Sequence, residues 1–329
     1  MIKILQGNCI DKLKELDDES VQCVVTSPPY WGLRDYGTAT WEGGDENCEH
    51  LADRSKYEKN FNDSLQSTNT GTYARDIIGK WECPKCKAVR IDDQLGLEET
   101  PQEYVQSLVN VFREVKRVLK DDGTVWLNLG DSYSEKQLIG IPFRVVFALQ
   151  DDGWYLRQDI IWAKPNPMPE SVKDRCTKSH EYIFLLSKKP KYYYDVDAIK
   201  EPAIKDDPTN TVGGNKYPGK YQNVGTSQNV YTNNGFKNKR SVWTITTKPY
   251  TEAHFATFPT DIPEICIKAS SKEGDTVLDM FAGAGTTGLV ADRLGRDAIL
   301  IELNKDYIKL IEDRLRNDAP MFAQIEKEN

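Results

Sequence analysis

The sequence predicts an α/β fold built on a doubly wound, mostly parallel β-sheet. Runs of β-branched and aliphatic residues, each the length of a strand, alternate with longer patterns of helical periodicity. This alternation is expected of βαβ units, because parallel strands need a crossover between them. Near the C-terminus a glycine-rich turn joins a strand directly to a helix, which is typical of the edge where such a sheet binds its ligands.

The predicted elements follow this order along most of the chain. Strands are predicted at 3–7, 21–26, 124–130, 157–164, 181–189, 275–281 and 297–303, and helices at 10–16, 104–119, 141–150, 286–294 and 306–315. The second helix has the clearest start, because Thr100 suits the N-cap, Pro101 the first helical position and Glu103 the capping box. We expect this helix to end at Asp122-Gly123.

Two stretches lack this periodicity. Residues 38–95 are polar and rich in Gly, Asn and Asp, and they predict an insertion. Residues 205–240 are rich in Asn, Gly, Tyr and Thr, and they predict loops. We therefore divide the chain into core segments at 1–37, 96–190 and 251–329, an insertion at 38–95 and a loop-rich region at 191–250.

The composition predicts a globular protein of the cytoplasm. Hydrophobic residues make up 39% and charged residues 29% of the 329 residues, and no apolar run has the length of a membrane span. The first residues, MIKILQGNC, fit a strand better than a signal peptide. Seven cysteines, an odd number without secretory context, indicate reduced thiols.

The charge of the chain is divided unevenly. The net charge is −8, yet residues 161–250 hold 15 Lys and Arg against 8 Asp and Glu. No acidic residue lies between Pro208 and Thr251. The basic residues of this stretch include Lys216, Lys220, Lys237, Lys239 and Arg240. A local basic region on an acidic protein suits a confined surface that contacts phosphates, although a solvated loop has the same composition.

The glycine-rich turn predicts a nucleoside-containing cofactor. It follows a strand that ends at Asp279, and the next strand ends at Glu302, where a carboxylate can accept hydrogen bonds from ribose hydroxyls. Tight packing between strand and helix is the alternative. A dinucleotide fits less well, because Thr286-Thr287 crowd the glycine pattern and Asp279 would repel a pyrophosphate. A sulfonium cofactor with an amino-acid tail suits this carboxylate better.

These segments together resemble the DNA amino-methyltransferases that use S-adenosylmethionine. The resemblance rests on Ser27-Pro28-Pro29-Tyr30, on the run DMFAGAGTTG at 279–288 and on HFATFP at 254–259. The catalytic motif precedes the cofactor motif, as in the circularly permuted β-type of this family. The resemblance implies a seven-stranded, Rossmann-like methyltransferase sheet. It also implies cofactor-binding residues at Asn8, Phe255, Thr257, Pro259, Asp279, Phe281, Gly283, Gly285, Thr286, Thr287 and Glu302.

The catalytic motif suits transfer of a methyl group to an aromatic amine. The lone pair of such an amine is delocalised into the ring, so acceptors for its two protons would free it for attack. The Ser27 side chain and the Pro28 carbonyl supply these acceptors, and two prolines restrict the loop to one geometry. Tyr30 would stack on a base flipped out of the duplex. The nearby thiols of Cys9 and Cys23 are not needed for such a transfer.

The first residue of the motif favours cytosine. In the family that the chain resembles, serine is typical of enzymes that make N4-methylcytosine, whereas Asp or Asn is typical of N6-methyladenine. An adenine-N6 enzyme is the nearest alternative, and an RNA base methyltransferase is a further one. A zinc-stabilised DNA-binding module with a vestigial catalytic core is a third alternative. The intact catalytic and cofactor motifs argue against that module.

The insertion carries a second group of residues with its own chemistry. Cys48 and His50 form a C-x-H pair, and Cys83 and Cys86 form a C-x-x-C pair, which together offer a tetrahedral set of zinc ligands. Free cysteines prefer burial, and this polar segment offers little core in which to bury them. We therefore predict a structural zinc site, with four unrelated surface residues as the alternative.

The remaining expectations concern partners. By resemblance, residues 191–250 lie where β-type enzymes recognise their target, so their lysines and Arg240 would contact the phosphates of double-stranded DNA. Members of this type are often dimers, and we expect a homodimer by analogy. The expected location is the cytoplasm of a prokaryotic cell or of a phage-infected host.

Overall fold

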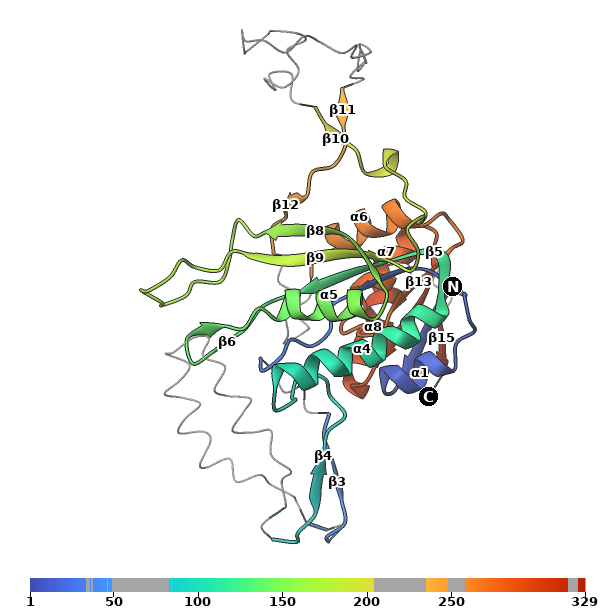
Figure 1. Ribbon diagram of the computed structural model, residues 1–329. Helices are drawn as coiled ribbons and strands as arrows, with labels where there is room; N and C mark the ends of the chain where they lie inside the picture. The colour runs from blue at the N-terminus through green and yellow to red at the C-terminus, as the bar shows by residue number, and fades with distance from the viewer. Residues whose placement is uncertain are drawn as a thin grey trace.

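A computed structural model of the protein describes residues 1–33, 36, 38–45, 47–48, 83, 85–203, 235–247, 258–318 and 325–328. A nine-stranded sheet runs through its centre in the order β12-β8-β9-β5-β2-β13-β14-β1-β15 (Figure 1). All neighbouring strands are parallel except for the two pairs that β9 makes with β5 and β8. The strands are β1 (Ile2–Gln6), β2 (Val21–Thr26), β5 (Leu119–Leu129), β8 (Tyr155–Ala163), β9 (His180–Ser187), β12 (Val242–Thr244), β13 (Thr276–Asp279), β14 (Asp297–Glu302) and β15 (Ile325–Glu328).

Helices cover both faces of this sheet (Figure 1). Buried side chains of α1 (Cys9–Lys14), α4 (Pro101–Val118) and α5 (Ile141–Asp151) form one hydrophobic cluster with the sheet. Those of α6 (Asp261–Ser270), α7 (Thr286–Arg293) and α8 (Lys305–Asp318) form a second cluster with it. The central strand β2 is buried along its whole length and contributes to both clusters. The result is the three-layer arrangement expected of a doubly wound sheet.

Shorter elements lie outside these layers. Strand β3 (Thr40–Glu42) pairs with β4 (Val89–Ile91) in the predicted insertion, β6 (Tyr133–Ser134) with β7 (Gln137–Leu138), and β10 (Glu201–Pro202) with β11 (Phe236–Lys237). A 3₁₀ turn, η1, covers Asp197–Ile199. No helix in the described part of the chain is long and apolar enough to cross a membrane.

The seven predicted strands are all present and form the inner part of the sheet, but the predicted total of seven is too small. Strands β12 and β15 add one strand at each edge. They have three and four residues, which is too short for an alternating pattern to stand out in the sequence. Helix α6, of ten residues, was not predicted either.

Helix α4 begins as predicted and ends earlier than predicted. The capping box is present, because Thr100 accepts a hydrogen bond from the Glu103 main chain and the Glu103 carboxylate accepts one from the Thr100 main chain. The helix ends at Val118 and not at Asp122-Gly123. The chain becomes extended at once because Leu119 pairs with Val21 of β2, and regular pairing resumes at Thr124 after an irregular stretch. Tertiary pairing therefore overrides the local stop signal.

Candidate active site and cofactor site

The carboxyl ends of four neighbouring parallel strands meet at one edge of the sheet. Strands β2, β13, β14 and β1 lie side by side there. Their last residues are Thr26, Asp279, Glu302 and Gln6. Ser27 of the predicted catalytic motif directly follows the first of these strands, and the predicted cofactor residue Asn8 follows the last. Segments that lie at opposite ends of the sequence are therefore brought together, at the edge where doubly wound sheets bind ligands.

Asp279 links the end of β2, which precedes the predicted catalytic motif, to the predicted cofactor turn after β13. Its carboxylate accepts hydrogen bonds of 2.7 Å from the Thr26 hydroxyl and 2.7 Å from the Thr287 hydroxyl, and one of 3.1 Å from the Phe281 main chain. The side chain is only 1% exposed, and burial raises its pKa to about 6 against the opposing effect of these donors. Asp279 thus fixes the start of the glycine-rich turn against the end of β2.

Hydrogen bonds also hold the glycine-rich turn to the Glu302 carboxylate. The Gly283 main chain donates to the Glu302 carboxylate at 2.7 Å, and the Asn304 main chain donates to it at 2.8 Å. Burial raises the Glu302 pKa to about 7. Gly285 has a φ of +73°, and a Cβ atom there would lie 2.8 Å from the Ile311 side chain of α8, so the turn requires glycine at this position.

Asn8 has a local structural role at this edge. Its side-chain oxygen accepts a hydrogen bond of 2.9 Å from the Ile10 main chain and caps the first turn of α1. A cavity of about 490 Å³ adjoins the ends of β1 and β14. It is lined by Gln6, Gly7, Thr38, Thr40, Ile91, Asp93, Leu303 and Lys305. Its volume is in the range of small-molecule sites. Leu303, the neighbour of Glu302, lines this cavity, but Glu302 and the glycine-rich turn do not.

Contacts with the rest of the protein hold the predicted catalytic motif in place. Pro28 is buried, and the Pro29 carbonyl accepts a hydrogen bond of 2.8 Å from the hydroxyl of Tyr104 in α4. The indole of Trp31 donates to the Glu98 carbonyl at 2.9 Å. The Tyr30 ring packs against the backbone at Gly130, where a Cβ atom would lie 2.5 Å from the ring. The loop therefore has little freedom to move away from the edge of the sheet.

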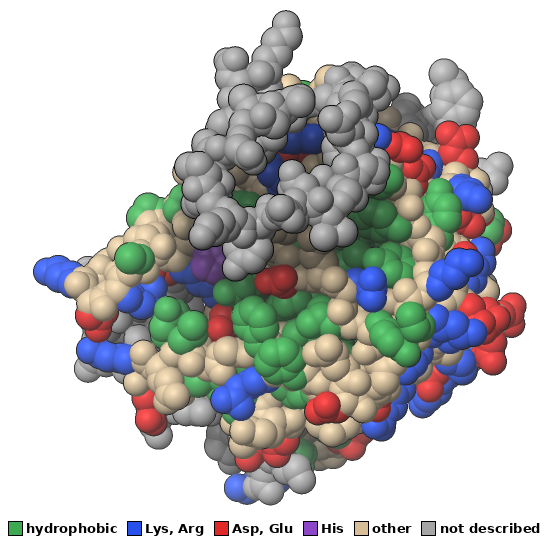
Figure 2. Space-filling view, turned by 45° about the horizontal axis from the view of Figure 1, so that its top comes forward, with side chains coloured by type: hydrophobic (Ala, Val, Ile, Leu, Met, Phe, Trp, Pro, Cys, Tyr) green, Lys and Arg blue, Asp and Glu red, His purple; other side chains and the backbone are tan. Residues whose placement is uncertain are grey.

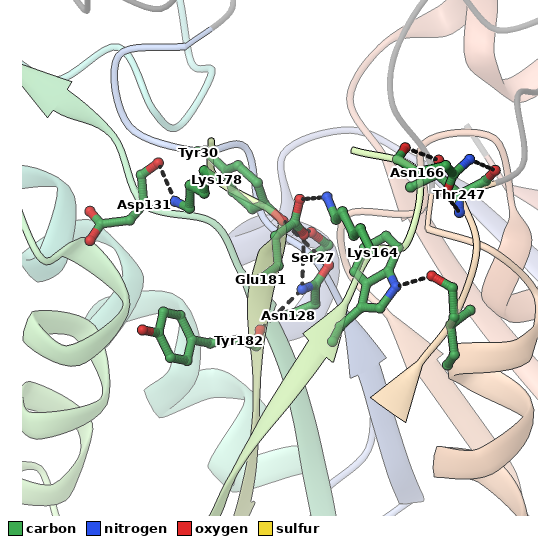
Figure 3. Close-up of polar contacts among 12 residues, drawn as sticks. Ser27, Tyr30, Asn128, Asp131, Lys164, Asn166, Lys178, Glu181, Tyr182 and Thr247 are labelled. Atoms are coloured by element: carbon green, nitrogen blue, oxygen red, sulfur yellow. Dashed lines mark hydrogen bonds and ion pairs between the residues drawn. The ribbon is translucent and has the colours of Figure 1, made fainter. Parts of the chain in front are cut away.

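Beyond the motif itself, a polar network surrounds the Tyr30 hydroxyl (Figure 3). Ser27 donates to this hydroxyl at 3.3 Å, and Tyr30 donates to Glu181 at 2.7 Å. Asn128 donates to Glu181 at 3.1 Å, and Lys164 forms an ion pair with the other oxygen of the same carboxylate. These three partners in the network around the Tyr30 hydroxyl were not predicted from the sequence. The signal lies in the strand ends, since Asn128, Lys164 and Glu181 stand at or beside the ends of the predicted β5, β8 and β9.

Comparison with known proteins identifies the family. The sequence profile of the N6_N4 methyltransferase family, described as DNA methylase, matches residues 21–313. The chain belongs to this DNA methylase family. Its relatives include the Type II methyltransferase M.SmaI of Serratia marcescens, 40% identical over 95% of this chain and 90% of the relative. M.Cfr9I of Citrobacter freundii, also a Type II methyltransferase, is 38% identical over 98% of this chain and 90% of the relative.

Solved structures share the fold of this methylase. The PvuII DNA methyltransferase, described as cytosine-N4-specific, aligns over 94% of this chain and 85% of its own, with a TM-score of 0.60 and 19% identity. A putative DNA modification methylase from Thermus thermophilus, in complex with S-adenosyl-L-methionine, aligns over all of both chains with a TM-score of 0.58 and 21% identity. The protein is therefore an amino-methyltransferase of the N4/N6 family that uses S-adenosylmethionine and acts on DNA.

Three of the four predicted zinc ligands of this methylase come together. The sulfur atoms of Cys48, Cys83 and Cys86 all lie within 4.8 Å of one another, and the Cys48 and Cys83 sulfurs are 3.8 Å apart. Donation from the main chain of Cys86 lowers the pKa of the Cys83 thiol to about 7, which favours the thiolate. Gly44 permits this approach, since a Cβ atom there would lie 2.8 Å from the Cys86 sulfur. His50 lies outside the described residues.

Only some of the residues predicted to contact DNA or the cofactor near the loop-rich region lie in the described part of the methylase. Among those described, Arg240 and Lys237 form ion pairs with Glu201 at 2.5 Å and 3.8 Å, and Lys239 lies over the ring of Trp243. Lys216, Lys220, Phe255 and Thr257 lie outside the described residues. Pro259 is described and is buried just before α6. On the face that Figure 2 shows, basic side chains are mixed with acidic ones along one side.

Proposed function

We propose that this protein transfers a methyl group from S-adenosylmethionine to the exocyclic N4 amine of a cytosine flipped out of double-stranded DNA. The observation that carries the proposal is the position of Ser27. It lies at the end of β2, one residue after Thr26, whose hydroxyl bonds to Asp279 at the start of the cofactor turn. An acceptor for the amine thus stands directly beside the predicted cofactor site.

Different residues at this edge would have different roles in binding the cofactor. When bound, S-adenosylmethionine supplies an electrophilic methyl group on its sulfonium. Glu302 would accept hydrogen bonds from the ribose hydroxyls, and the glycine-rich turn, with Phe281, Gly283, Gly285, Thr286 and Thr287, would let the cofactor approach the backbone. Asp279 is fully engaged within the protein, so we infer that it acts by fixing this turn and the end of β2.

The catalytic loop would then activate the amine. Ser27 and the Pro28 carbonyl would accept hydrogen bonds from its two N–H groups, which would localise the nitrogen lone pair. The N–C bond would then form as the S–C bond of the sulfonium breaks, and one amine proton would leave to solvent. The buried Pro28 and the bond from Tyr104 to the Pro29 carbonyl keep these acceptors in place, which lowers the entropic cost of reaching the reactive geometry. Tyr30, supported on one side by Gly130, would stack on the flipped base.

Two findings support cytosine over adenine. The first residue of the catalytic motif is serine, and the fold is shared with the PvuII enzyme described as cytosine-N4-specific. Adenine N6 remains the alternative within the family. The bacterial relatives are Type II methyltransferases, which supports a role in the modification half of a restriction system in the bacterial cytoplasm. A homodimer and target recognition by residues 191–250 are part of the same proposal.

Product analysis tests this proposal. The protein is incubated with methyl-labelled S-adenosylmethionine and double-stranded DNA, the DNA is digested to nucleosides, and the labelled nucleoside is identified by mass spectrometry. We expect N4-methyldeoxycytidine. Label on N6-methyldeoxyadenosine would replace cytosine with adenine, and label only on RNA offered in parallel would reject DNA as the substrate. Ser27→Ala should abolish transfer while the cofactor still binds.

We also propose a structural zinc ion at the three thiols. A tetrahedral zinc site with Zn–S bonds of about 2.3 Å places its sulfurs about 3.8 Å apart. The Cys48 and Cys83 sulfurs have this separation, which is far too long for a disulfide. Zinc would stabilise this polar segment, because none of the three cysteines belongs to either main hydrophobic cluster.

Metal analysis of purified protein tests the zinc proposal. We expect about one zinc per chain in the natural protein and loss of that zinc in Cys83→Ser. Cys176→Ser is the matched control, because Cys176 is an exposed free thiol on the loop between β8 and β9. Zinc content far below one per chain in the natural protein, or equal zinc in both variants, would reject the site.

A further inference from the structure

The hydrogen bonds that begin at Ser27 have one order of donors and acceptors. A tyrosine hydroxyl has one hydrogen, and the Glu181 carboxylate at 2.7 Å is a nearer acceptor for it than the Asn128 side-chain oxygen at 3.3 Å. The Tyr30 oxygen then accepts from the Ser27 hydroxyl at 3.3 Å. Burial raises the pKa of Tyr30 well above its usual value, so this hydroxyl keeps its proton. The hydrogen bonds therefore run from Ser27 to Tyr30 and end at Glu181.

Glu181, at the end of this series of hydrogen bonds, is held so that its carboxylate only accepts. The Lys164 ammonium pairs with one oxygen of Glu181, and the Asn128 amide donates to the other at 3.1 Å. Asn128 is itself oriented by a second bond of 3.0 Å, to the Tyr182 carbonyl. The Lys164 ammonium also lies 4.2 Å from the centre of the Trp162 ring. Figure 3 shows these side chains converging from β5, β8 and β9 on the catalytic loop.

The direction of these hydrogen bonds matters because a serine hydroxyl has no fixed role as donor or acceptor. An Asp or Asn carbonyl oxygen at this position is an acceptor by nature, whereas a hydroxyl can either donate or accept. An amine that must lose its conjugation to the ring needs acceptors for its protons. A serine hydrogen pointed at the nitrogen would instead bind the lone pair that attacks the methyl group. An enzyme with serine here therefore needs a device that turns this hydrogen away.

We propose that Glu181 is a positioning residue for the reaction, which acts through Tyr30 to hold Ser27 as a hydrogen-bond acceptor toward the substrate amine. Asn128 and Lys164 keep the Glu181 carboxylate in place for this role. The inference rests on the proposed function and deepens it, because it names what makes the serine form of the motif competent. Tyr30 then has a second task besides stacking, and this task belongs to its hydroxyl alone.

Glu181→Gln tests the direction of the chain at constant size. Because Lys164 attracts the amide oxygen, the amide nitrogen would face Tyr30 and Asn128, so the Tyr30 hydroxyl would lose its nearest acceptor and keep only the Asn128 side-chain oxygen at 3.3 Å. We expect kcat for DNA methylation to fall about 10²-fold, the loss typical of a misplaced reacting group. The cofactor Kd and the KM for DNA should stay within about twofold, since neither depends on this direction. Glu181→Asp keeps an acceptor and should recover part of kcat.

A double-variant cycle shows whether Glu181 acts through Tyr30. Tyr30→Phe keeps the ring and removes the hydroxyl, so it should also lower kcat. In the Tyr30→Phe background, Glu181→Gln should cause no further loss, because the link to Ser27 is already gone. Glu264→Gln is the matched control, since Glu264 is exposed on α6, away from this network, and forms an ion pair with Lys268 in its own helix. We expect this control to match the natural protein.

The outcomes separate this inference from the proposed function. If the natural protein makes no methylcytosine, the proposed function fails before any variant is compared. If the natural protein is active and Glu181→Gln retains its kcat, the positioning role is wrong. Additive losses in the double variant would also overturn it, because Glu181 would then act independently of Tyr30. Thermal unfolding of each variant identifies a loss of folding, in which case Tyr30→Phe and Glu181→Asp decide the question.

Discussion

At the scale of single residues, two carboxylates at adjacent strand ends, Asp279 buried and Glu302 partly exposed, serve different purposes. Asp279 is only 1% exposed and accepts from two hydroxyls and one main-chain donor, all from the protein. Glu302 is held by two main-chain donors, and its neighbour Leu303 lines the cavity at the ends of β1 and β14. Asp279 therefore assembles the site, whereas Glu302 is the carboxylate placed to meet a ligand.

The raised pKa of Glu302 predicts that cofactor binding depends on pH. Its ordinary value is 4.5 and burial raises it to about 7, so the free protein holds a proton here up to neutral pH. The ionised form accepts ribose hydrogen bonds better, so the Kd for S-adenosylmethionine should fall as the pH rises from 6 to 8. Calorimetry over this range measures the effect. Glu302→Gln should weaken binding roughly tenfold or more and remove the pH dependence.

The same shift has the opposite effect on the stability of the cofactor-free protein. Between pH 4.5 and about 7 the folded chain binds more protons at Glu302 than the unfolded chain does. Its contribution to the free energy of unfolding is therefore lost as the pH rises through this range. A cofactor affinity that stays constant from pH 6 to 8 in the natural protein would contradict the role given to Glu302.

The close contact between Gly130 and Tyr30 gives a second prediction at this scale. A Cβ atom at Gly130 would lie 2.5 Å from a ring carbon of Tyr30, so Gly130→Ala must displace the ring. We expect kcat to fall about 10²-fold because the hydroxyl would leave its place between Ser27 and Glu181. Rapid single-turnover methylation measures this loss, while cofactor binding should be unchanged. Full activity in the variant would show that the ring position is not critical.

At the scale of elements, the start of α4 can be tested without touching the site. Thr100 and Glu103 form a reciprocal capping box at 3.2 Å and 2.9 Å. Thr100→Ala should lower the free energy of unfolding by about 1 kcal/mol, measured with urea, because one helix donor loses its partner. Glu103→Gln preserves the box and should cost less. Equal losses in the two variants, or a loss of methylation, would contradict this explanation.

Elements with a strong periodic signal could be predicted from the sequence, and weak ones could not. The capping box marked the start of α4, but its end was set by pairing of Leu119 with Val21, a contact that local sequence does not encode. Strands β12 and β15 are too short to show a pattern. The partners of the catalytic loop were missed for a related reason. Glu181 meets Tyr30 only because β9 runs antiparallel beside β5, which no single segment reveals.

At the scale of the whole molecule, the fold explains why motifs at opposite ends of the chain act together. Strands β2 and β13 are neighbours in the sheet although their sequences lie far apart, and Thr26 bonds to Asp279 across them. Both motifs follow parallel strands, and the carboxyl ends of parallel strands lie at the same edge of a sheet. The hydrogen bonds that carry it out depend on side-chain geometry that motifs alone do not give.

The overall charge of the molecule limits how it binds DNA. With a net charge of −8, association must rely on a few local cations, and we propose Arg240 as one of them. Its side chain is 66% exposed and is paired with Glu201, so it can exchange this partner for a phosphate. Arg240→Ala should weaken DNA binding uniformly across sequences and reduce the salt slope of log K by about 1. Fluorescence anisotropy at several salt concentrations measures both quantities.

A matched control decides whether this effect is specific to the loop-rich region. Arg293 on α7 is also exposed and paired with an acidic residue, Asp318, but it belongs to the helical layer and not to residues 191–250. Arg293→Ala carries the same change of charge, so it should leave the salt slope unaltered if DNA contacts the region around Arg240. Equal reductions in the two variants would mean that net charge alone governs the affinity, and the assignment of Arg240 to the DNA surface would then be wrong.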